Sequence, residues 1–371
     1  MKRRVLFAAA ATLLTAGAAS AQITQVIDST GDGQDNLLNG PQAVAFAPSG
    51  NMYVMGAFSD NVFEVTPASE ISEIIDGTGD GQVALDSPRD VAVDGLGNVF
   101  VSGGDVVFEI TPGGGISTII DASGDGEGAT LQGAHGLAVD SLNNVYVTGS
   151  VSDNVFQVTP GGVITEIVDG AGAGAGQALN LPLAVAVDDL HNVYVTSSYD
   201  LILRVTPGGA VDAIIDETGD GMGNSLDYPS ALAIDASRNV FVTGQFSNNV
   251  FRIDSTGTVT EIVDRYGDLM GNPLENPSSL GVDSAGNVYV CGISSDNALR
   301  ITPDGLITEI VDETGDGAGR VLNQAIGLAT TPAGVVMVSG QSSDNAFTVI
   351  HFFKDGFETG DTRAWSEVEP P

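Results

Sequence analysis

The chain has 371 residues and a formal net charge of −36, with 48 acidic and 12 basic residues. This charge excludes the electrostatic attraction on which non-specific nucleic-acid binding depends, and it opposes binding to anionic membrane surfaces. The 49 glycines favour many tight turns over long helices. We therefore expect no nucleic-acid partner and no membrane insertion. We expect a monomer that binds a protein or a small molecule, and the net charge favours a cationic one.

Residues 1–21 predict a secretory signal peptide. Lys2, Arg3 and Arg4 precede a short apolar run, and the sequence Ala19-Ser20-Ala21 fits a cleavage site. Cleavage near Ala21 removes three basic residues and no acid, which moves the net charge from −36 to −39. The mature protein is expected to be secreted or periplasmic.

An internal repeat fills the rest of the chain. The segment VIDSTGDG at Val26 recurs as IIDGTGDG, IIDASGDG, IVDGAGAG, IIDETGDG, IVDRYGDL and IVDETGDG. Its first aspartates are 45 to 48 residues apart and stand at Asp28, Asp76, Asp121, Asp169, Asp216, Asp264 and Asp312. Such a period is typical of repeat architectures, so the repeat should decide the fold.

Each repeat contains four short segments with strand character. In one copy, Gly136–Val147 predicts two strands around a tight turn, Ser152–Gly162 a third strand, and Val163–Asp169 a fourth. Four short antiparallel strands in this period are typical of a β-propeller blade. The lone cysteine, Cys291, lies in the apolar run NVYVCG, which predicts a buried and unreactive thiol.

The number of segments predicts how the ring closes. The three-strand block and the fourth-strand segment each occur seven times, but the fourth-strand segment Ile23–Asp28 precedes every block. We therefore predict an all-β, seven-bladed propeller over residues 22–353, in which the N-terminal strand completes the last blade and removes two open sheet edges. Residues 354–371 form an acidic C-terminal tail outside the repeat.

The pattern GDG…L-N-x-P…AVD…GNVYV…DN…TP-x-G resembles the NHL-repeat type of bacterial propeller, over nearly the whole mature chain. This resemblance implies the propeller fold, although six blades are commoner in NHL proteins than seven. It implies no single activity, because propellers include both enzymes and binding platforms. The enzymes that the chain resembles are propeller lactonases and streptogramin lyases. They use a divalent metal or a His/Glu pair at the central channel, and no lone Glu occurs among the predicted inner strands.

The strand order sorts the loops onto two faces. The loops after the second and fourth strands share one face, which collects most of the aspartates and should be strongly negative. The turns of the AVD type share the opposite face, and their repeated Asp and Asn residues fit turn chemistry. These residues are Asp94, Asp140, Asp188, Asp235 and Asp283, with Asn98, Asn144, Asn192, Asn239 and Asn287.

Positions that break the repeat are better candidates for function. One variable position before each innermost strand should ring the mouth of the central channel, and it is occupied by Gln42, Arg89, His135, Leu183, Ser230, Ser278 and Ile326. Arg89, Asp90 and His135 are the candidate catalytic or binding group, with ordinary rim residues as the alternative. His191, on the opposite face, and His351, after the last strand, are weaker candidates.

The DETGDG loops also resemble the first half of a calcium loop. An EF-hand loop requires D-x-[DN]-x-[DN]-G and a carboxylate at position 12, and the loop at Asp216 supplies Asp216, Asp220 and Asp227 at positions 1, 5 and 12. Thr218 at position 3 departs from this pattern. The alternative is structural, because Asp caps turn amides and Gly permits positive φ. Calcium at Asp216, Asp220 and Asp227 is therefore one of two interpretations.

These observations favour an exported, non-enzymatic propeller that binds a ligand or protein through its acidic face. The alternative is a lactonase-like or streptogramin-lyase-like enzyme that acts at the channel, with Arg89, Asp90 and His135 as its site. A third interpretation is an extracellular scaffold presented by its tail.

Overall fold

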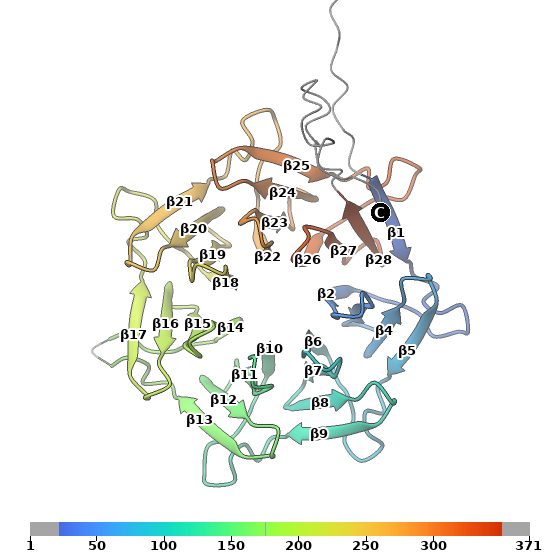
Figure 1. Cartoon of the computed structure of the whole chain (residues 1–371), viewed down its shortest axis with the longest axis horizontal. Helices are drawn as coiled ribbons and strands as arrows, with labels where there is room; N and C mark the ends of the chain where they lie inside the picture. The colour runs from blue at the N-terminus through green and yellow to red at the C-terminus, as the bar shows by residue number, and fades with distance from the viewer. Residues whose placement is uncertain (1–21, 175, 351–371) are drawn as a thin grey trace, which may run out of the picture.

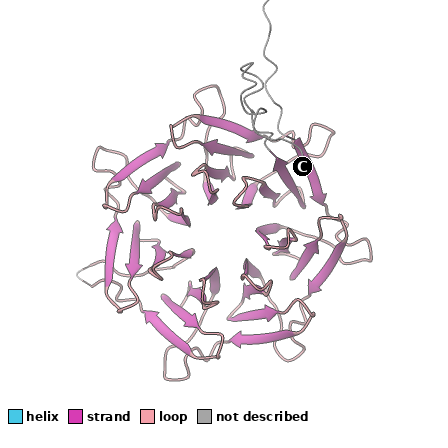
Figure 2. Ribbon diagram, viewed as in Figure 1, coloured by secondary structure: helices cyan, strands magenta, loops and turns pink. Residues whose placement is uncertain are grey.

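The computed structural model describes residues 22–174 and 176–350, and these residues form a ring of seven four-stranded antiparallel sheets. Figure 2 shows that strands and loops make up the whole described ring. The all-β, seven-bladed prediction is therefore confirmed. No helix among the described residues is long and apolar enough to cross a bilayer. The predicted signal peptide, the acidic tail and His351 lie outside the described residues.

Each blade takes four strands, which are ordered below from the channel outward. Blades 1 to 3 are β2 (Pro41–Phe46), β3 (Met52–Gly56), β4 (Asn61–Val65), β5 (Ile71–Ile75); β6 (Pro88–Val93), β7 (Val99–Gly103), β8 (Val106–Ile110), β9 (Ile116–Ile120); and β10 (Ala134–Val139), β11 (Val145–Gly149), β12 (Asn154–Val158), β13 (Ile164–Val168). Blades 4 and 5 are β14 (Val185–Val187), β15 (Val193–Ser197), β16 (Leu201–Val205), β17 (Val211–Ile215); and β18 (Pro229–Ile234), β19 (Val240–Gly244), β20 (Asn249–Ile253), β21 (Val259–Val263). Blades 6 and 7 are β22 (Pro277–Val282), β23 (Val288–Gly292), β24 (Asn297–Ile301), β25 (Ile307–Val311); and β26 (Ala325–Thr330), β27 (Val336–Gly340), β28 (Asn345–Ile350), β1 (Gln22–Ile27).

The N-terminal strand closes the ring. β1 pairs antiparallel with β28, from Gln22 opposite Ile350 to Ile27 opposite Ala346. β1 thus occupies the outermost place in blade 7 that the fourth strand occupies in every other blade (Figure 1). The predicted closure is confirmed, and it gives the outer edge of β28 a hydrogen-bonding partner.

Burial follows the position of each strand in its blade. The second strands are buried throughout except at the first residue of β3, and most third strands expose only their fourth residue in part. These strands have a strand on either side and a neighbouring blade on each face, so near-continuous apolar runs suit them. The fourth strands lie at the rim and are mostly half-buried; β9 and β13 each have one exposed residue and a buried last residue.

The Asp and Asn of each AVD-type turn bond to one another. In blade 3, Asp140 Oδ1 accepts hydrogen bonds from the backbone N–H groups of Leu142 (2.8 Å) and Asn144 (2.9 Å). Asp140 Oδ2 accepts one from Asn144 Nδ2 at 2.8 Å. Blades 2, 4, 5 and 6 have equivalent contacts. The predicted turn chemistry is confirmed, because each carboxylate satisfies turn amides that the strands leave free.

The GDG loops need their first glycine for two reasons. Gly219 has a φ of +61°, a left-handed conformation that glycine adopts without strain. A Cβ at this position would lie 1.8 Å from the carbonyl oxygen of Asn224. The leucine that follows each loop is almost fully buried; these residues are Leu38, Leu85, Leu131, Leu179, Leu226, Leu274 and Leu322. The repeated hexapeptide therefore has a structural role in every blade.

Candidate functional site at the channel mouth

The seven positions that vary from blade to blade line one cavity on the ring axis. It has a volume of about 410 Å³, and the seven residues in its wall are Gln42, Arg89, His135, Leu183, Ser230, Ser278 and Ile326. Six of them lie in the first strands, which are the innermost strands of their blades (Figure 1), and Leu183 lies two residues before the first strand of blade 4, β14. Within the described part of the chain, the cavity wall has three ionisable residues, Arg89, Asp90 and His135. All three belong to blades 2 and 3.

Asp90 in β6 links blade 2 to blade 3. Its Oδ1 accepts a hydrogen bond from the backbone N–H of Val91, and its Oδ2 accepts one from Leu137 in β10, both at 2.8 Å. Burial raises the pKa of this carboxyl to about 6, although the two N–H donors act in the opposite direction. Ser279 has the equivalent place in blade 6, and its hydroxyl accepts from the N–H of Leu328 at 3.1 Å. Asp90 therefore joins two blades, and its carboxyl is also a titratable group in the cavity wall.

His135 has a fixed ring orientation. Its Nδ1 is 2.8 Å from the carbonyl oxygen of Leu183 in the next blade. Because a carbonyl only accepts, Nδ1 carries the proton, and Nε2 of the neutral ring is left as an acceptor. Burial lowers the pKa of His135 to about 4; the bond to Leu183 opposes this shift, and the charge of Arg89 adds to it. His135 is therefore neutral at pH 7.

Arg89 is the exposed cation of the cavity wall. The four ion pairs of residues 22–174 and 176–350 involve other side chains, and Arg89 donates no hydrogen bond within this part of the chain. An arginine without a protein partner keeps all five N–H donors available to a ligand.

Hydroxyl groups from the second strands support the cavity wall. In blade 3, Thr148 Oγ1 accepts a hydrogen bond from Gly136 N–H at 2.8 Å; in blade 7, Ser339 Oγ accepts one from Gly327 N–H at 3.1 Å. Cys291 has the equivalent place in blade 6, where it is fully buried and its Sγ is 3.4 Å from the carbonyl oxygen of Ile326. Burial raises the pKa of this thiol to about 11. The prediction of a buried thiol is confirmed.

The serines of the cavity are not paired with a base. Ser230 Oγ donates to the carbonyl oxygen of Pro277 and Ser278 Oγ to that of Ile326, both at 3.0 Å. Ser279 Oγ donates to the carbonyl oxygen of Leu328 at 3.2 Å. None of the three hydroxyls is bonded to His135. Nucleophilic catalysis by serine depends on such a pair, and the described residues of the cavity wall contain none.

The carboxylates of the Asp216 loop accept hydrogen bonds within the loop. Thr218 donates its N–H (3.0 Å) and its hydroxyl (2.6 Å) to Asp216 Oδ1. Asn224 Nδ2 donates to Asp220 Oδ2 at 2.8 Å. Asp227 lies at the exposed end of the loop. Within residues 22–174 and 176–350, no three His, Cys, Asp or Glu side chains are close enough to hold an ion, so Asp216, Asp220 and Asp227 do not form such a group. Calcium binding stays a prediction.

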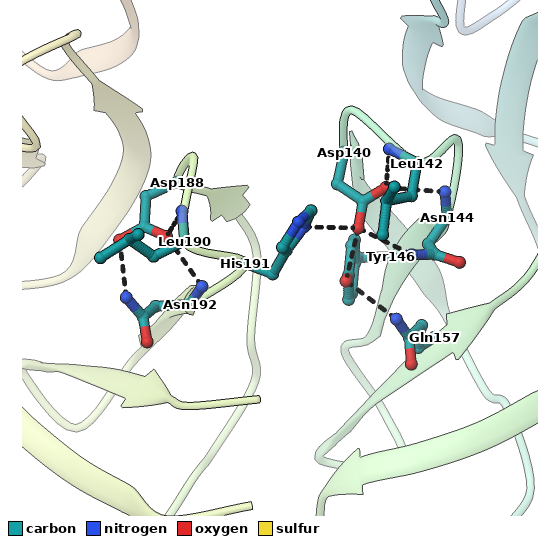
Figure 3. Close-up of polar contacts among 9 residues, drawn as sticks. All are labelled: Asp140, Leu142, Asn144, Tyr146, Gln157, Asp188, Leu190, His191 and Asn192. Atoms are coloured by element: carbon teal, nitrogen blue, oxygen red, sulfur yellow. Dashed lines mark hydrogen bonds and ion pairs between the residues drawn. The ribbon is translucent and has the colours of Figure 1, made fainter. Parts of the chain in front are cut away.

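His191 lies on the opposite face, away from the cavity. Its Nδ1 is 3.2 Å from Asp140 Oδ2, so it joins the turn of blade 4 to the turn of blade 3 (Figure 3). Tyr146 donates to the same oxygen at 3.0 Å, and Gln157 donates to the Tyr146 hydroxyl at 2.9 Å. This network accounts for His191 as a contact between blades.

Neighbouring blades are joined by hydrogen bonds from backbone to side chain, which we call the interblade clasps. The sequence analysis did not predict them. In each clasp, an Asp or Asn Oδ1 after a second strand accepts from a backbone N–H in the next blade. The pairs are Asp60–Ser87, Asp105–Gly133, Asp153–Leu181, Asp200–Tyr228, Asn248–Asn276, Asp296–Gln324 and Asp344–Gly40, at 2.6 to 2.8 Å. Sequence analysis assigned these aspartates only to the acidic face. The two residues of each of the first six pairs are 27 or 28 positions apart in the sequence, and this regular spacing could have indicated the clasps.

Two larger grooves lie between blades on the opposite face. One, of about 620 Å³, includes Asp188, Arg204 and Arg238; the other, of about 530 Å³, includes Asp235 and Arg252. Both are lined by turn residues that recur in several blades, and Arg204 is paired with Asp212 at 2.9 Å. The channel mouth is the better candidate because its wall is built from residues that do not repeat.

Comparison with known proteins supports the fold and no particular activity. No protein-family model matches the chain and no curated protein sequence matches it, so the NHL resemblance stays a prediction. Among solved structures, a streptogramin B lyase has a TM-score of 0.70 at 14% identity, and the match covers 89% of this chain and 97% of that one. A catalytically inactive virginiamycin B lyase from Staphylococcus aureus, solved with quinupristin, has a TM-score of 0.68 at 12% identity and coverage of 90% and 100%. The extracellular domain of a Bacteroides thetaiotaomicron protein has a TM-score of 0.60 at 11% identity, with coverage of 90% of this chain and 40% of that one.

Proposed function

We propose that the protein is an exported, non-enzymatic propeller whose channel mouth binds a small ligand. The observation that carries this proposal is the convergence of all seven variable positions on one cavity of about 410 Å³. This volume lies within the range of small-molecule sites, which also combine apolar walls with a few polar groups. Leu183 and Ile326 supply apolar surface to this cavity, while Arg89 and His135 Nε2 supply a donor and an acceptor.

The hydrogen bonding of the acidic loops supports the mouth as the binding site. Carboxylates such as Asp76 and Asp216 accept bonds from their own turns, and the clasp aspartates accept bonds from the next blade. Figure 1 shows the loops after the fourth strands extending beyond the outer edge of the ring, away from the axis. These carboxylates set the general field of the face, whereas the mouth supplies the groups that recognise one ligand.

A mouth-blocking variant tests the proposal. Ser278→Trp places a large ring in the cavity, and Ser237→Trp places the same ring in a turn on the opposite face. The immobilised proteins are incubated with a small-molecule extract of spent bacterial medium, and retained compounds are identified by mass spectrometry. We expect a compound that wild type and Ser237→Trp retain and Ser278→Trp does not. The absence of any compound that depends on the mouth would contradict the proposal.

An enzyme acting at the same mouth is the second candidate. It is favoured by His135, which lines the cavity and whose unprotonated Nε2 can accept a proton, and by the fold that the chain shares with streptogramin lyases. The absence of a nucleophile–base pair among the described cavity residues makes it the weaker candidate. Incubation with quinupristin and with simple lactones, followed by mass spectrometry, should detect no conversion. Conversion that His135→Ala abolishes would replace the binding proposal with an enzymatic one.

A further inference from the structure

The channel mouth has two chemically different sides. Its ionisable residues, Arg89, Asp90 and His135, all belong to blades 2 and 3. The wall that blades 4 to 7 contribute has no ionisable side chain among the described residues and includes Leu183, Ile293 and Ile326. The ionisable groups are therefore confined to one side of the ring, whereas the other side combines apolar side chains with the neutral polar ones of Ser230, Gln245, Ser278 and Ser279.

Exposed aromatic side chains lie at the rim of blade 5, on the side of the mouth whose described residues include no ionisable group. The rings of Tyr228 and Phe246 stack with centroids 4.6 Å apart and an interplanar angle of 23°. Phe246 is 58% exposed and directly follows Gln245, which lines the cavity. Tyr199, on the neighbouring loop of blade 4, is also 58% exposed. Exposed aromatic groups beside a cavity provide a surface on which a flat ligand can stack.

The order of the blades places this aromatic rim across the mouth from Arg89. In a ring of seven blades, blade 5 lies opposite the boundary of blades 1 and 2. Arg89 is exposed and free of protein partners among the described residues, whereas the two oxygens of Asp90 face the N–H groups of Val91 and Leu137. The cation is thus presented to the cavity, while the neighbouring carboxylate is bonded to backbone.

We infer that the mouth binds an aromatic anion, a flat apolar ring system carrying a carboxylate or sulfonate. The ring lies against the rim of Tyr228 and Phe246, and the anionic group is bonded by Arg89, whose planar guanidinium matches such groups. This inference rests on the proposed function and specifies its ligand class. It differs from the cationic ligand that the net charge of −36 favours, because a local, unpaired guanidinium acts at contact distance. Solvent-exposed charges farther away are largely screened beyond about 8 Å at physiological salt.

Two fluorescent probes with the same ring system separate the two halves of the inference. 1-Anilinonaphthalene-8-sulfonate carries an anionic group, and N-phenyl-1-naphthylamine has the same rings without it. Both are titrated into the folded protein at 150 mM salt, and folding of each variant is checked by circular dichroism. We expect each chain to bind one molecule of the sulfonate probe. Arg89→Gln should weaken binding of the sulfonate probe about tenfold and change the affinity for the neutral probe less than twofold.

Two further variants complete the test. Phe246→Ser removes an exposed ring and should weaken both probes about fivefold, whereas Arg238→Gln makes the same charge change on the opposite face and should alter neither. An unchanged sulfonate affinity in Arg89→Gln overturns the inference. If Phe246→Ser still weakens the neutral probe in that case, the mouth remains a binding site and only the anionic class is wrong. If neither mouth variant affects either probe, the inference and the proposed function both fail.

Discussion

The carboxylate of Asp344 accepts a hydrogen bond from the backbone N–H of Gly40 at 2.8 Å, across 304 residues of sequence. This contact is the seventh interblade clasp, and it joins blade 7 to blade 1 where the chain closes on itself. The other six clasps join blades that follow each other in the chain. Closure of the ring therefore uses both the β1–β28 pairing at the rim and a clasp nearer the axis.

Removing the closing clasp should destabilise the ring. We expect Asp344→Ala to lower the free energy of unfolding by about 2 kcal/mol, because it deletes a charge-assisted hydrogen bond and places Ala at a φ of +50°. Asp344→Asn is the matched control, since Asn248 makes the same clasp in blade 5 at 2.7 Å. Urea denaturation measures both variants. An equal loss in Asp344→Asn and Asp344→Ala would show that the amide cannot replace the carboxylate at this position.

The closing strand should contribute to stability as much as an internal strand does. Ile27 at the end of β1 and Ile75 at the end of β5 have equivalent places, and each is 3% exposed. Ile27→Ala and Ile75→Ala should each cost about 2–4 kcal/mol through lost burial and cavity formation. Thermal and urea unfolding provide the comparison. A cost for Ile27→Ala below about 1 kcal/mol would mean that β1 is only loosely attached.

Asp90 and His135 should give opposing pH dependences of stability. The pKa of Asp90 is raised to about 6, so its protonation stabilises the fold as the pH falls from 6 towards 4. The pKa of His135 is lowered to about 4, so acidification from 6.5 towards 4 removes the stability that the neutral ring provides.

Single variants separate the two effects. Relative to wild type, Asp90→Asn should lose stability on acidification from pH 6.5 to 4, and His135→Gln should gain it, by up to about 1.4 kcal/mol per pH unit. Urea unfolding at several pH values measures both differences. Parallel curves for the two variants and wild type would contradict the assigned shifts.

Calcium should bind only weakly at the Asp216 loop. The ion has to compete with the hydrogen bonds that Thr218 and Asn224 make to Asp216 and Asp220, so we expect half-saturation at about 1 mM or above. The melting temperature is followed against calcium concentration, with Asp227→Asn as the variant and Asp86→Asn, in the equivalent loop of blade 1, as the control. Tight, stoichiometric binding that Asp227→Asn abolishes would support a specific site instead.

The thiol of Cys291 should be inert until the protein unfolds. It is fully buried with a pKa raised to about 11, so iodoacetamide at pH 8 should label it only in denaturant. Cys291→Ser should cost less than about 1 kcal/mol, because Ser102 and Ser339 occupy the same place in other blades. Mass spectrometry measures labelling, and rapid labelling of the native protein would contradict this assignment.

The blade count and the closing strand could be predicted from the sequence because both depend on local patterns repeated at a fixed period. The convergence of Arg89 and His135 was also predictable, since equivalent positions in a ring face one axis. The pairing of Nδ1 of His135 with the carbonyl of Leu183 was not, because it depends on the distance between neighbouring blades.

The clasps were missed for a related reason. Asp60 and Asp153 look like surface acids in the sequence, and only the packing of blades brings a backbone N–H to each of them. The acidic loops were open to two interpretations for the same reason, because their aspartates have the spacing of calcium ligands and also that of turn-capping residues. The structure shows that Asp216 and Asp220 accept hydrogen bonds within their own turn.

The pairing of Gln22 with Ile350 has a mechanical consequence. The start of β1 and the end of β28 lie side by side in an antiparallel pair, so a force that separates these two residues loads the hydrogen bonds one after another. β1 would separate from β28 one hydrogen bond at a time before the force reaches the other blades. A tether through both ends would therefore make this protein easy to pull open, whereas a tether through one end would leave the ring unstressed.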